Sequence, residues 1–291
     1  MPYSRFRYND MRKGMVLEGG AMRGLYTAGV LDVLMKNDIS VDGYIGVSAG
    51  ITFGCNYKSR QIGRTLRYNL RFLNDPRYSG LISLIRTGDI FGAEFCYHEI
   101  PEKLDPFDYE TFRNNPVDLY TVATDAYTGK AVYCKLGDGG ERDLEWMRAS
   151  ASMPVVSRAV KVDGYTLFDG GVSDSIPIRY FMDLGYERNI VVLTRPRGYR
   201  KKEGGCGFIT KVALRKYPRM IEALDERSRE YNQTLDYLDS LEKEGKVLII
   251  APTSDLHVKR IEKDKSKIQA IYDLGVSDTE SRLSEIREFL E

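Results

Sequence analysis

A serine lies between two glycines in the segment Gly46-Val47-Ser48-Ala49-Gly50. The residues from Tyr44 to Val47 predict a strand that turns at this serine into a helix. Glycines on both sides of such an elbow relieve crowding, and the strained turn presents the serine oxygen to a substrate carbonyl. The alternative is a tight turn with a serine helix cap, because serine favours caps and glycine favours turns. The motif alone leaves both interpretations open.

A glycine-rich segment lies upstream, between a short apolar run (residues 15–18) and an amphipathic stretch (residues 25–35). It reads Gly19-Gly20-Ala21-Met22-Arg23-Gly24. Backbone N–H groups at such a turn can bind a phosphate or an ester oxyanion. A plain strand-to-helix connection is the other interpretation. A dinucleotide loop is disfavoured, because Ala21 breaks the G-x-G-x-x-G spacing and the next predicted strand runs into the serine elbow.

An aspartate that ends a predicted strand is the third candidate. Residues 165–168 lead into Asp169, and Gly170 and Gly171 follow it. An aspartate is ionised at neutral pH and accepts a serine proton when it lies within hydrogen-bond reach. A simple Asx-turn is the competing interpretation. A second copy, Asp138-Gly139-Gly140, lies in a polar loop with no strand leading into it, so we predict a surface turn there.

The order of these three motifs resembles that of the patatin-like phospholipase family. That family combines a glycine-rich oxyanion loop, a G-x-S-x-G elbow and a D-G-[GA] aspartate in a Ser–Asp dyad. The resemblance covers about residues 13 to 195 and extends to Arg148–Pro154 and Ser175-Ile176-Pro177. Ala21 departs from the pattern, because many members have a third glycine there. Its amide is retained, so an oxyanion role remains open.

The resemblance implies a three-layer α/β/α fold with a mainly parallel central sheet, and hydrolysis of lipid acyl esters without a metal or organic cofactor. Ser48 would be the nucleophile and Asp169 the proton acceptor. The amides of Gly19, Gly20 and Ala21 would hold the oxyanion. Arg23 would be a structural residue or a head-group contact. The supporting glycines of the motifs would be Gly24, Gly46, Gly50, Gly170 and Gly171.

A histidine triad is the strongest rival to the dyad. Ser48, Asp169 and His257 follow the chain order of an α/β-hydrolase triad. However, an elbow at residue 48 leaves room for only two strands before it, and His257 lies in a polar loop after a predicted strand. The other histidine, His98, is expected to be packed or exposed. We therefore prefer the dyad.

Two further functions remain open. One is a catalytically silent lipid-binding protein that keeps the elbow as a scaffold. The other is an acyltransferase that uses the same dyad with an acceptor other than water. Labelling by a fluorophosphonate probe separates an activated serine from a silent one, and offering acyl acceptors identifies the transferase.

Composition predicts a cytoplasmic enzyme. The chain has 291 residues, a net charge of +1 and 29% charged residues, so no global field favours nucleic acid. Its start has no apolar signal region, and no run approaches the ~18 apolar residues of a membrane span. The spacing of the cysteines predicts reduced thiols: Cys55, Cys96, Cys134 and Cys206. Oligomeric state is left open.

The chain is expected to divide into a catalytic domain (13–195) and a mostly helical C-terminal extension (196–291). Strands are predicted at Met15–Leu17, Tyr44–Val47, Asp118–Ala123, Ala131–Cys134, Tyr165–Phe168, Asn189–Thr194 and Val247–Ile250. A hairpin is predicted at Asp163-Gly164. Ser277 to Glu280 is a capping-box pattern and predicts the start of the last helix.

Two segments have alternative roles. Residues 77–108 carry apolar side chains that either line an acyl pocket or fill the core: Leu81, Ile82, Leu84, Ile85, Phe91 and Phe95. The basic connector from Arg195 to Lys202 is either a solvated linker or a patch for peripheral contact with an anionic membrane. Binding to anionic and neutral vesicles would separate the last two.

Overall fold

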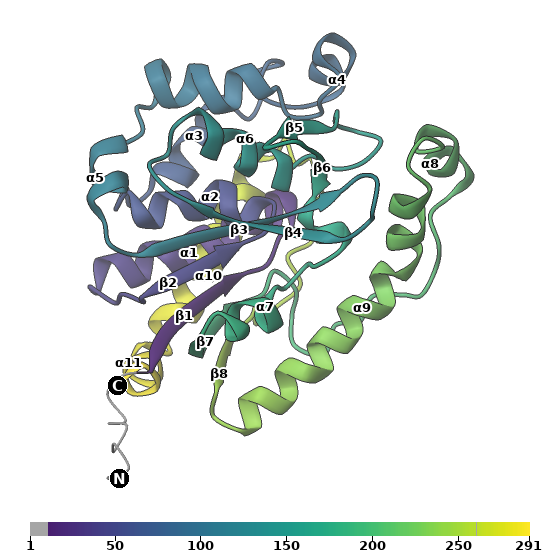
Figure 1. The fold of residues 1–291 in the computed structure, drawn as a ribbon. Helices are drawn as coiled ribbons and strands as arrows, with labels where there is room; N and C mark the ends of the chain where they lie inside the picture. Colours follow the sequence, from purple (N-terminus) through teal and green to yellow (C-terminus); the bar gives the residue numbers. More distant parts are fainter. Residues whose placement is uncertain (1–10, 260) are drawn as a thin grey trace.

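An eight-stranded sheet forms the centre of the protein in a computed structural model that describes residues 11–259 and 261–291 (Figure 1). The central strands β3, β2, β1, β7 and β8 are parallel, and β4, β5 and β6 join antiparallel on the β3 side. The strands are β1 (Arg12–Leu17), β2 (Gly43–Gly46), β3 (Asp118–Asp125), β4 (Ala131–Leu136), β5 (Val160–Val162), β6 (Tyr165–Asp169), β7 (Tyr186–Val192) and β8 (Val247–Ile250). The predicted hairpin joins β5 to β6.

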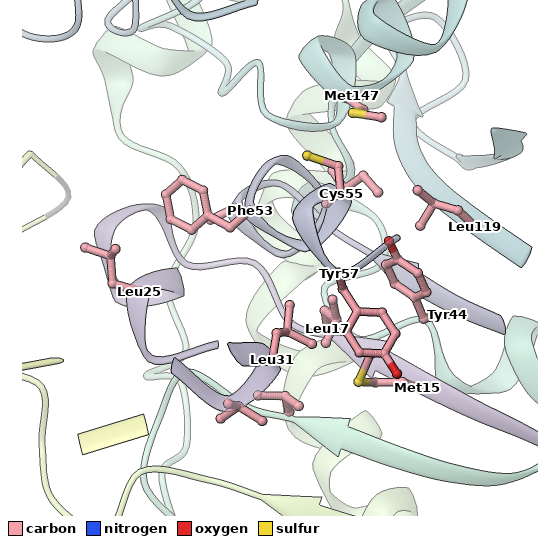
Figure 2. Close-up of a cluster of buried hydrophobic side chains, with 14 of the residues drawn as sticks. Met15, Leu17, Leu25, Leu31, Tyr44, Phe53, Cys55, Tyr57, Leu119 and Met147 are labelled. Atoms are coloured by element: carbon pink, nitrogen blue, oxygen red, sulfur yellow. The ribbon is translucent and has the colours of Figure 1, made fainter. Parts of the chain in front are cut away.

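Helices cover both faces of this sheet, which confirms the predicted three-layer architecture. One face packs against α1 (Gly24–Lys36), α2 (Ala49–Lys58), α3 (Arg64–Phe72), α6 (Glu141–Ser150) and α10 (Lys265–Glu280). Figure 2 shows part of this core, with side chains such as Leu17, Leu31 and Tyr44 packed together. The other face packs against α7 (Ile178–Asp183) and α9 (Pro218–Lys243).

The segment between α3 and β3 contains α4 (Leu81–Thr87), a π-helix (Phe95–Leu104) and α5 (Tyr109–Asn114). Its apolar side chains have different environments. Leu81 and Ile85 on α4 are 68% and 75% exposed, whereas Phe95 is buried in the core. Phe91 lines a cavity beside Ser48. Filling the core therefore describes Phe95, and lining a pocket describes Phe91. The exposed side chains of α4 fit neither interpretation.

The region after residue 195 is tied to the sheet. Its strand β8 pairs in parallel with β7, and α9 packs beneath these strands (Figure 1). It also contains α8 (Phe208–Ala213) and α11 (Leu283–Leu290). The structure confirms that most of this region is helical, while a domain boundary at residue 195 stays a prediction.

The predicted capping box at Ser277 to Glu280 is wrong. These residues form the last turn of α10, and the next helix, α11, starts at Leu283. The Asp278 carboxylate accepts hydrogen bonds from the Thr253 amide and hydroxyl and from the Tyr26 hydroxyl. A capping box would use the side chains of Ser277 and Glu280, whereas the tertiary contacts in this turn are made by Asp278.

The described residues contain no helix that combines the length and the apolar character of a membrane span. The predicted cellular location stays a prediction.

Candidate functional site

Strand β3 brings Ser48 and Asp169 to one place in the fold. Gly46, at the end of β2, pairs with Thr121, and Asp169, at the end of β6, pairs with Ala123. Because β4 occupies the opposite edge of β3 along both stretches, β2 and β6 share one edge. Along β3, the partner of Asp169 therefore lies only two positions beyond the partner of Gly46, the last residue of β2. Both Ser48 and Asp169 line the same cavity.

The backbone at Ser48 forms the predicted elbow between β2 and α2. Ser48 has φ 53° and ψ −120°, which is a rarely populated conformation for a residue with a side chain. Two glycines allow the chain to turn so tightly. A Cβ at Gly46 would lie 2.7 Å from the Gly50 backbone, and one at Gly50 would lie 2.4 Å from the Leu17 carbonyl oxygen. The alternative of a serine helix cap is not supported, because the Ser48 side chain makes no capping hydrogen bond.

The end of α6 and the residues that follow it hold both Ser48 and Asp169. The Ser48 amide donates to the Ser150 hydroxyl oxygen at 3.0 Å. The Asp169 amide donates to the Ser152 carbonyl oxygen at 2.8 Å. Ser150 and Ser152 are themselves buried. The family resemblance extended to this segment but assigned it no role. In the structure it positions the elbow relative to the aspartate.

The two Asp-Gly-Gly copies have different surroundings. Asp169 is 5% exposed, and its carboxylate accepts the Gly171 amide at 2.7 Å. Asp138 is exposed, and its carboxylate accepts the Gly140 amide at 2.9 Å in a surface turn. The structure thus confirms the surface turn at Asp138. Only Asp169 lies in a cavity with a serine.

The glycine-rich loop lies against the serine. A Cβ at Gly19 would be 3.0 Å from the Cβ of Ser48, so only glycine allows this approach. Outside the helices and strands, no backbone carbonyl oxygen of the described residues accepts an N–H of Gly19, Gly20 or Ala21. Ala21 has φ 49°, the left-handed region that glycine adopts at less cost. Gly19, Gly20 and Ala21 line the same cavity as Ser48.

Buried Glu18 anchors this loop, and no sequence motif indicated this role. One carboxylate oxygen of Glu18 accepts the amide of Thr194 at 2.6 Å and its hydroxyl at 3.1 Å. The other accepts the Tyr231 hydroxyl of α9 at 2.7 Å. The carboxylate therefore connects the end of β1 to the chain after β7 and to the C-terminal region.

Neither histidine lies at this site. The His257 side chain is 86% exposed, and His257 lines neither of the two cavities that contain Ser48. His98 lies on the π-helix and also lines neither cavity. The geometry therefore offers no support for a triad.

Ser48 borders two cavities. The first, which we call the apolar cavity, has a volume of about 160 Å³. Its lining is mostly apolar and aromatic and includes Met22, Phe53, Tyr68, Phe91, Tyr97, Ile100 and Met147. Several of these residues come from the segment between α3 and β3, for which the sequence predicted either an acyl-pocket lining or a core-filling role.

The second, which we call the basic cavity, has a volume of about 590 Å³. It contains Ser48, Asp169 and the loop residues Gly19, Gly20 and Ala21. Cations outnumber carboxylates in its lining by five to two. The cations are Arg23, Arg195, Lys201, Lys202 and Arg227, and the carboxylates are Glu18 and Asp169. Arg23 thus lies within reach of a bound head group, as one of its two predicted roles requires.

Burial has a marked effect on Lys201. Desolvation, together with the nearby Arg227 and Arg23, lowers the pKa of Lys201 to about 7. Glu18 and Asp169 oppose this shift without cancelling it. Desolvation also lowers the pKa of Arg23, which nevertheless stays charged at neutral pH. In the sequence, Lys201 belongs to the basic connector from Arg195 to Lys202, and no pattern there indicates that its side chain enters a cavity.

Comparison with known proteins adds family information. The family described as patatin-like phospholipase matches residues 15–182, and a domain of unknown function, DUF6363, matches residues 217–291. A solved structure, VipD from Legionella pneumophila, aligns over 93% of this chain and 67% of its own with 12% identity and a TM-score of 0.42.

Three relatives illustrate the range of similar sequences. The uncharacterised protein YjjU of Escherichia coli K12 is 26% identical over 67% of this chain and 55% of its own length. An uncharacterised NTE family protein of Mycobacterium tuberculosis H37Rv is 27% identical over 62% of this chain and 48% of its own. The probable lipid hydrolase 463L of Invertebrate iridescent virus 6 is 28% identical over 61% and 66%.

The chain spans about half the length of the first two of these relatives. The family match, in contrast, covers more than half of this chain and includes the glycine-rich loop, the elbow and Asp169. The chain therefore belongs to the patatin-like phospholipase family.

Proposed function

We propose that this protein is a serine acyl hydrolase that cleaves fatty-acyl esters with a Ser48–Asp169 dyad. The observation that carries the proposal is one cavity that contains a strained serine elbow, a buried carboxylate and the glycine-rich loop. Membership in the patatin-like phospholipase family supports a lipid ester as the substrate.

The proposed reaction needs no third side chain. Asp169 accepts the hydroxyl proton of Ser48 while the Ser48 oxygen attacks the ester carbonyl carbon. The amides of Gly19, Gly20 and Ala21 hold the oxyanion that develops. The ester C–O bond then breaks, and the proton passes from Asp169 to the leaving alcohol. Water, activated by Asp169, hydrolyses the acyl-enzyme and restores the Ser48 hydroxyl.

The different linings of the two cavities suggest one orientation for a bound ester. The apolar cavity suits the acyl chain, because burial of methylene groups among aromatic and aliphatic side chains is favourable. The basic cavity would then take the alcohol part of the ester. Because both cavities contain Ser48, the carbonyl of a substrate in this orientation would lie between them.

The test is hydrolysis of a panel of fatty-acyl esters, combined with labelling by a fluorophosphonate probe. Wild-type protein is expected to release fatty acid and to be labelled at Ser48. A folded protein that neither hydrolyses esters nor reacts with the probe would support a silent lipid-binding protein instead. Products formed with an added alcohol in place of fatty acid would identify an acyltransferase.

A further inference from the structure

The basic cavity has a charge composition that the hydrolytic reaction does not require. The dyad and the oxyanion loop need one carboxylate and backbone amides, yet five cationic side chains line the space beside them. Three of these, Arg195, Lys201 and Lys202, come from the connector after β7, and Arg227 comes from α9. The region outside the family match therefore supplies most of the positive charge at the site.

Two of these cations have partners within the protein: the Arg195 guanidinium lies 3.9 Å from the Asp255 carboxylate, and Arg227 donates to the Gly171 carbonyl oxygen. The Glu18 carboxylate already accepts three hydrogen bonds from Thr194 and Tyr231. The Nε atom of Arg23 is buried and has no hydrogen-bond partner among the described residues. The Lys201 ammonium lies 3.5 Å from the Ser175 hydroxyl and 3.6 Å from the centre of the Tyr231 ring. Partly buried cations in such surroundings are stabilised by an anionic ligand.

Two neighbouring residues of the connector, Arg200 and Lys201, differ in whether their side chains enter the cavity. Arg200 points away from the cavity and pairs with Asp236 at 2.8 Å and with Asp239 at 3.5 Å on α9. Lys201, the next residue, lines the cavity. The amide of Lys201 donates to the Asn232 side chain, whose NH₂ group donates back to the Lys201 carbonyl. These two bonds fix the backbone so that the Lys201 side chain points inward.

We infer that the basic cavity binds a phosphate monoester through Arg195, Lys201 and Arg227, and that the substrate is an acyl ester whose alcohol part carries this phosphate. This inference rests on the ester hydrolysis proposed above. Arginine and lysine both suit phosphate oxygens, arginine through its fork of N–H donors and lysine as a compact charge.

The aromatic rings of the cavity disfavour a choline head group. A quaternary ammonium binds over the open faces of aromatic rings. Here the Arg195 guanidinium lies 4.7 Å from the centre of the Tyr199 ring, and the Lys201 ammonium covers Tyr231. The cations of the protein thus occupy these ring faces and would repel a second cation.

The test compares three substrates with the same acyl chain, each below its critical micelle concentration. They are an acyl glycerol phosphate, an acyl glycerophosphocholine and a monoacylglycerol. We expect kcat/KM for the phosphate monoester to exceed both others by about tenfold or more. Equal values, or a preference for the choline or neutral ester, would overturn the inference.

Matched variants identify the residues responsible. Lys201→Met and Arg195→Met each remove a cation from the cavity and keep an aliphatic stem, and we expect each to lower the phosphate-to-neutral kcat/KM ratio by about tenfold. Arg200→Met removes a cation that pairs outside the cavity and should leave the ratio unchanged. A ratio that stays at the wild-type value in both cavity variants contradicts the assignment.

Inorganic phosphate separates a lipid head group from a free anion. We expect it to inhibit monoacylglycerol hydrolysis in the wild type and to inhibit the Lys201→Met variant more weakly. If phosphate inhibits but the acyl glycerol phosphate is not preferred, the cavity binds a free anion and the head-group inference is wrong.

Calorimetry with the Ser48→Ala variant tests the inference separately from catalysis. This variant should bind the acyl glycerol phosphate more tightly than the monoacylglycerol, even if no ester proves to be a substrate. Failure of hydrolysis with preferential phosphate binding would refute the proposed function alone. Equal binding of the two lipids would refute the phosphate site.

Discussion

The two cavities beside Ser48 differ in chemistry and in the part of the chain that builds them. The lining of the apolar cavity lies entirely within residues 21–157, whereas the basic cavity takes four of its five cations from residues 195–227. They share Ala21, Ser48 and Met153. An apolar lining selects a ligand by surface area and shape, while a charged lining selects it by charge and donor geometry. In the proposed hydrolase, the acyl and alcohol parts of an ester would therefore be selected by separate linings on either side of Ser48.

The largest expected effect comes from Ser48, one of the three residues that the cavities share. Ser48→Ala removes the proposed nucleophile, so ester hydrolysis should fall by about a thousandfold or more. Fluorophosphonate labelling should disappear while the far-ultraviolet circular dichroism is retained. Substantial hydrolysis by the folded variant would show that the two cavities do not meet at a catalytic serine.

Asp169→Asn is expected to have the next largest effect. The amide cannot take the Ser48 proton, although it can still accept the Gly171 amide, so turnover should fall by about a hundredfold or more with little loss of stability. Asp138→Asn is the matched control, because it changes the other Asp-Gly-Gly aspartate. Equal activity of the two variants in a fatty-acid release assay would exclude Asp169 as the base.

A variant of the apolar cavity tests its assignment to the acyl chain. Ala93 lines this cavity, so Ala93→Phe should lower kcat/KM for long-chain esters by about tenfold more than for acetyl esters. Ala270→Phe, at an exposed position of α10, is the control. The prediction fails if the chain-length profile of Ala93→Phe matches the wild type.

The pH dependence of anion binding tests the basic cavity. Because the pKa of Lys201 is lowered to about 7, Lys201 is charged below this pH and neutral above it. The charged groups that act on it are Arg23, Arg227, Glu18 and Asp169. Inhibition by sulfate, which stays dianionic throughout, should weaken several-fold from about pH 6 to about pH 9.

The Lys201→Met variant is the control for this pH profile. It removes the titrating ammonium, so sulfate inhibition should be weaker at low pH and nearly independent of pH. A wild-type profile that persists in this variant would assign the pH dependence to another group.

The smallest expected effect belongs to the alternative base. His257 is exposed and lines neither cavity, so His257→Ala should retain ester hydrolysis within about twofold of the wild type. Near-complete loss of activity in a folded His257→Ala protein would replace the dyad by a triad.

Local patterns were sufficient for much of the fold. Strands such as β3 and β8 were predictable because runs of apolar residues satisfy a buried sheet. The Asp163-Gly164 turn predicted its hairpin from backbone preference alone. The capping-box prediction at Ser277 was wrong because α10 continues to Glu280, and in this last turn Asp278 bonds to Thr253 and Tyr26, which are distant in sequence. Contacts of this kind leave no local signal.

The candidate site also contains residues that the sequence predicts and residues that it does not. The glycines of the elbow and the loop were readable because close backbone approach permits no side chain at these positions. The hydrogen bond between Glu18 and Tyr231 could not be predicted from the sequence. The two residues are 213 positions apart and meet only through the packing of α9 against the sheet. A buried carboxylate–hydroxyl pair has no characteristic spacing in sequence.

The sequence by itself determined the backbone of the candidate site: a tight elbow at Ser48, a glycine-rich loop and an aspartate followed by two glycines. Tertiary structure alone decided what surrounds that centre. Arg200 and Lys201 are adjacent basic residues with the same appearance in sequence, yet one pairs with Asp236 at the surface and the other enters the cavity. The physical reason is that a side chain's direction depends on its backbone partners, and Asn232 on α9 fixes that direction for Lys201.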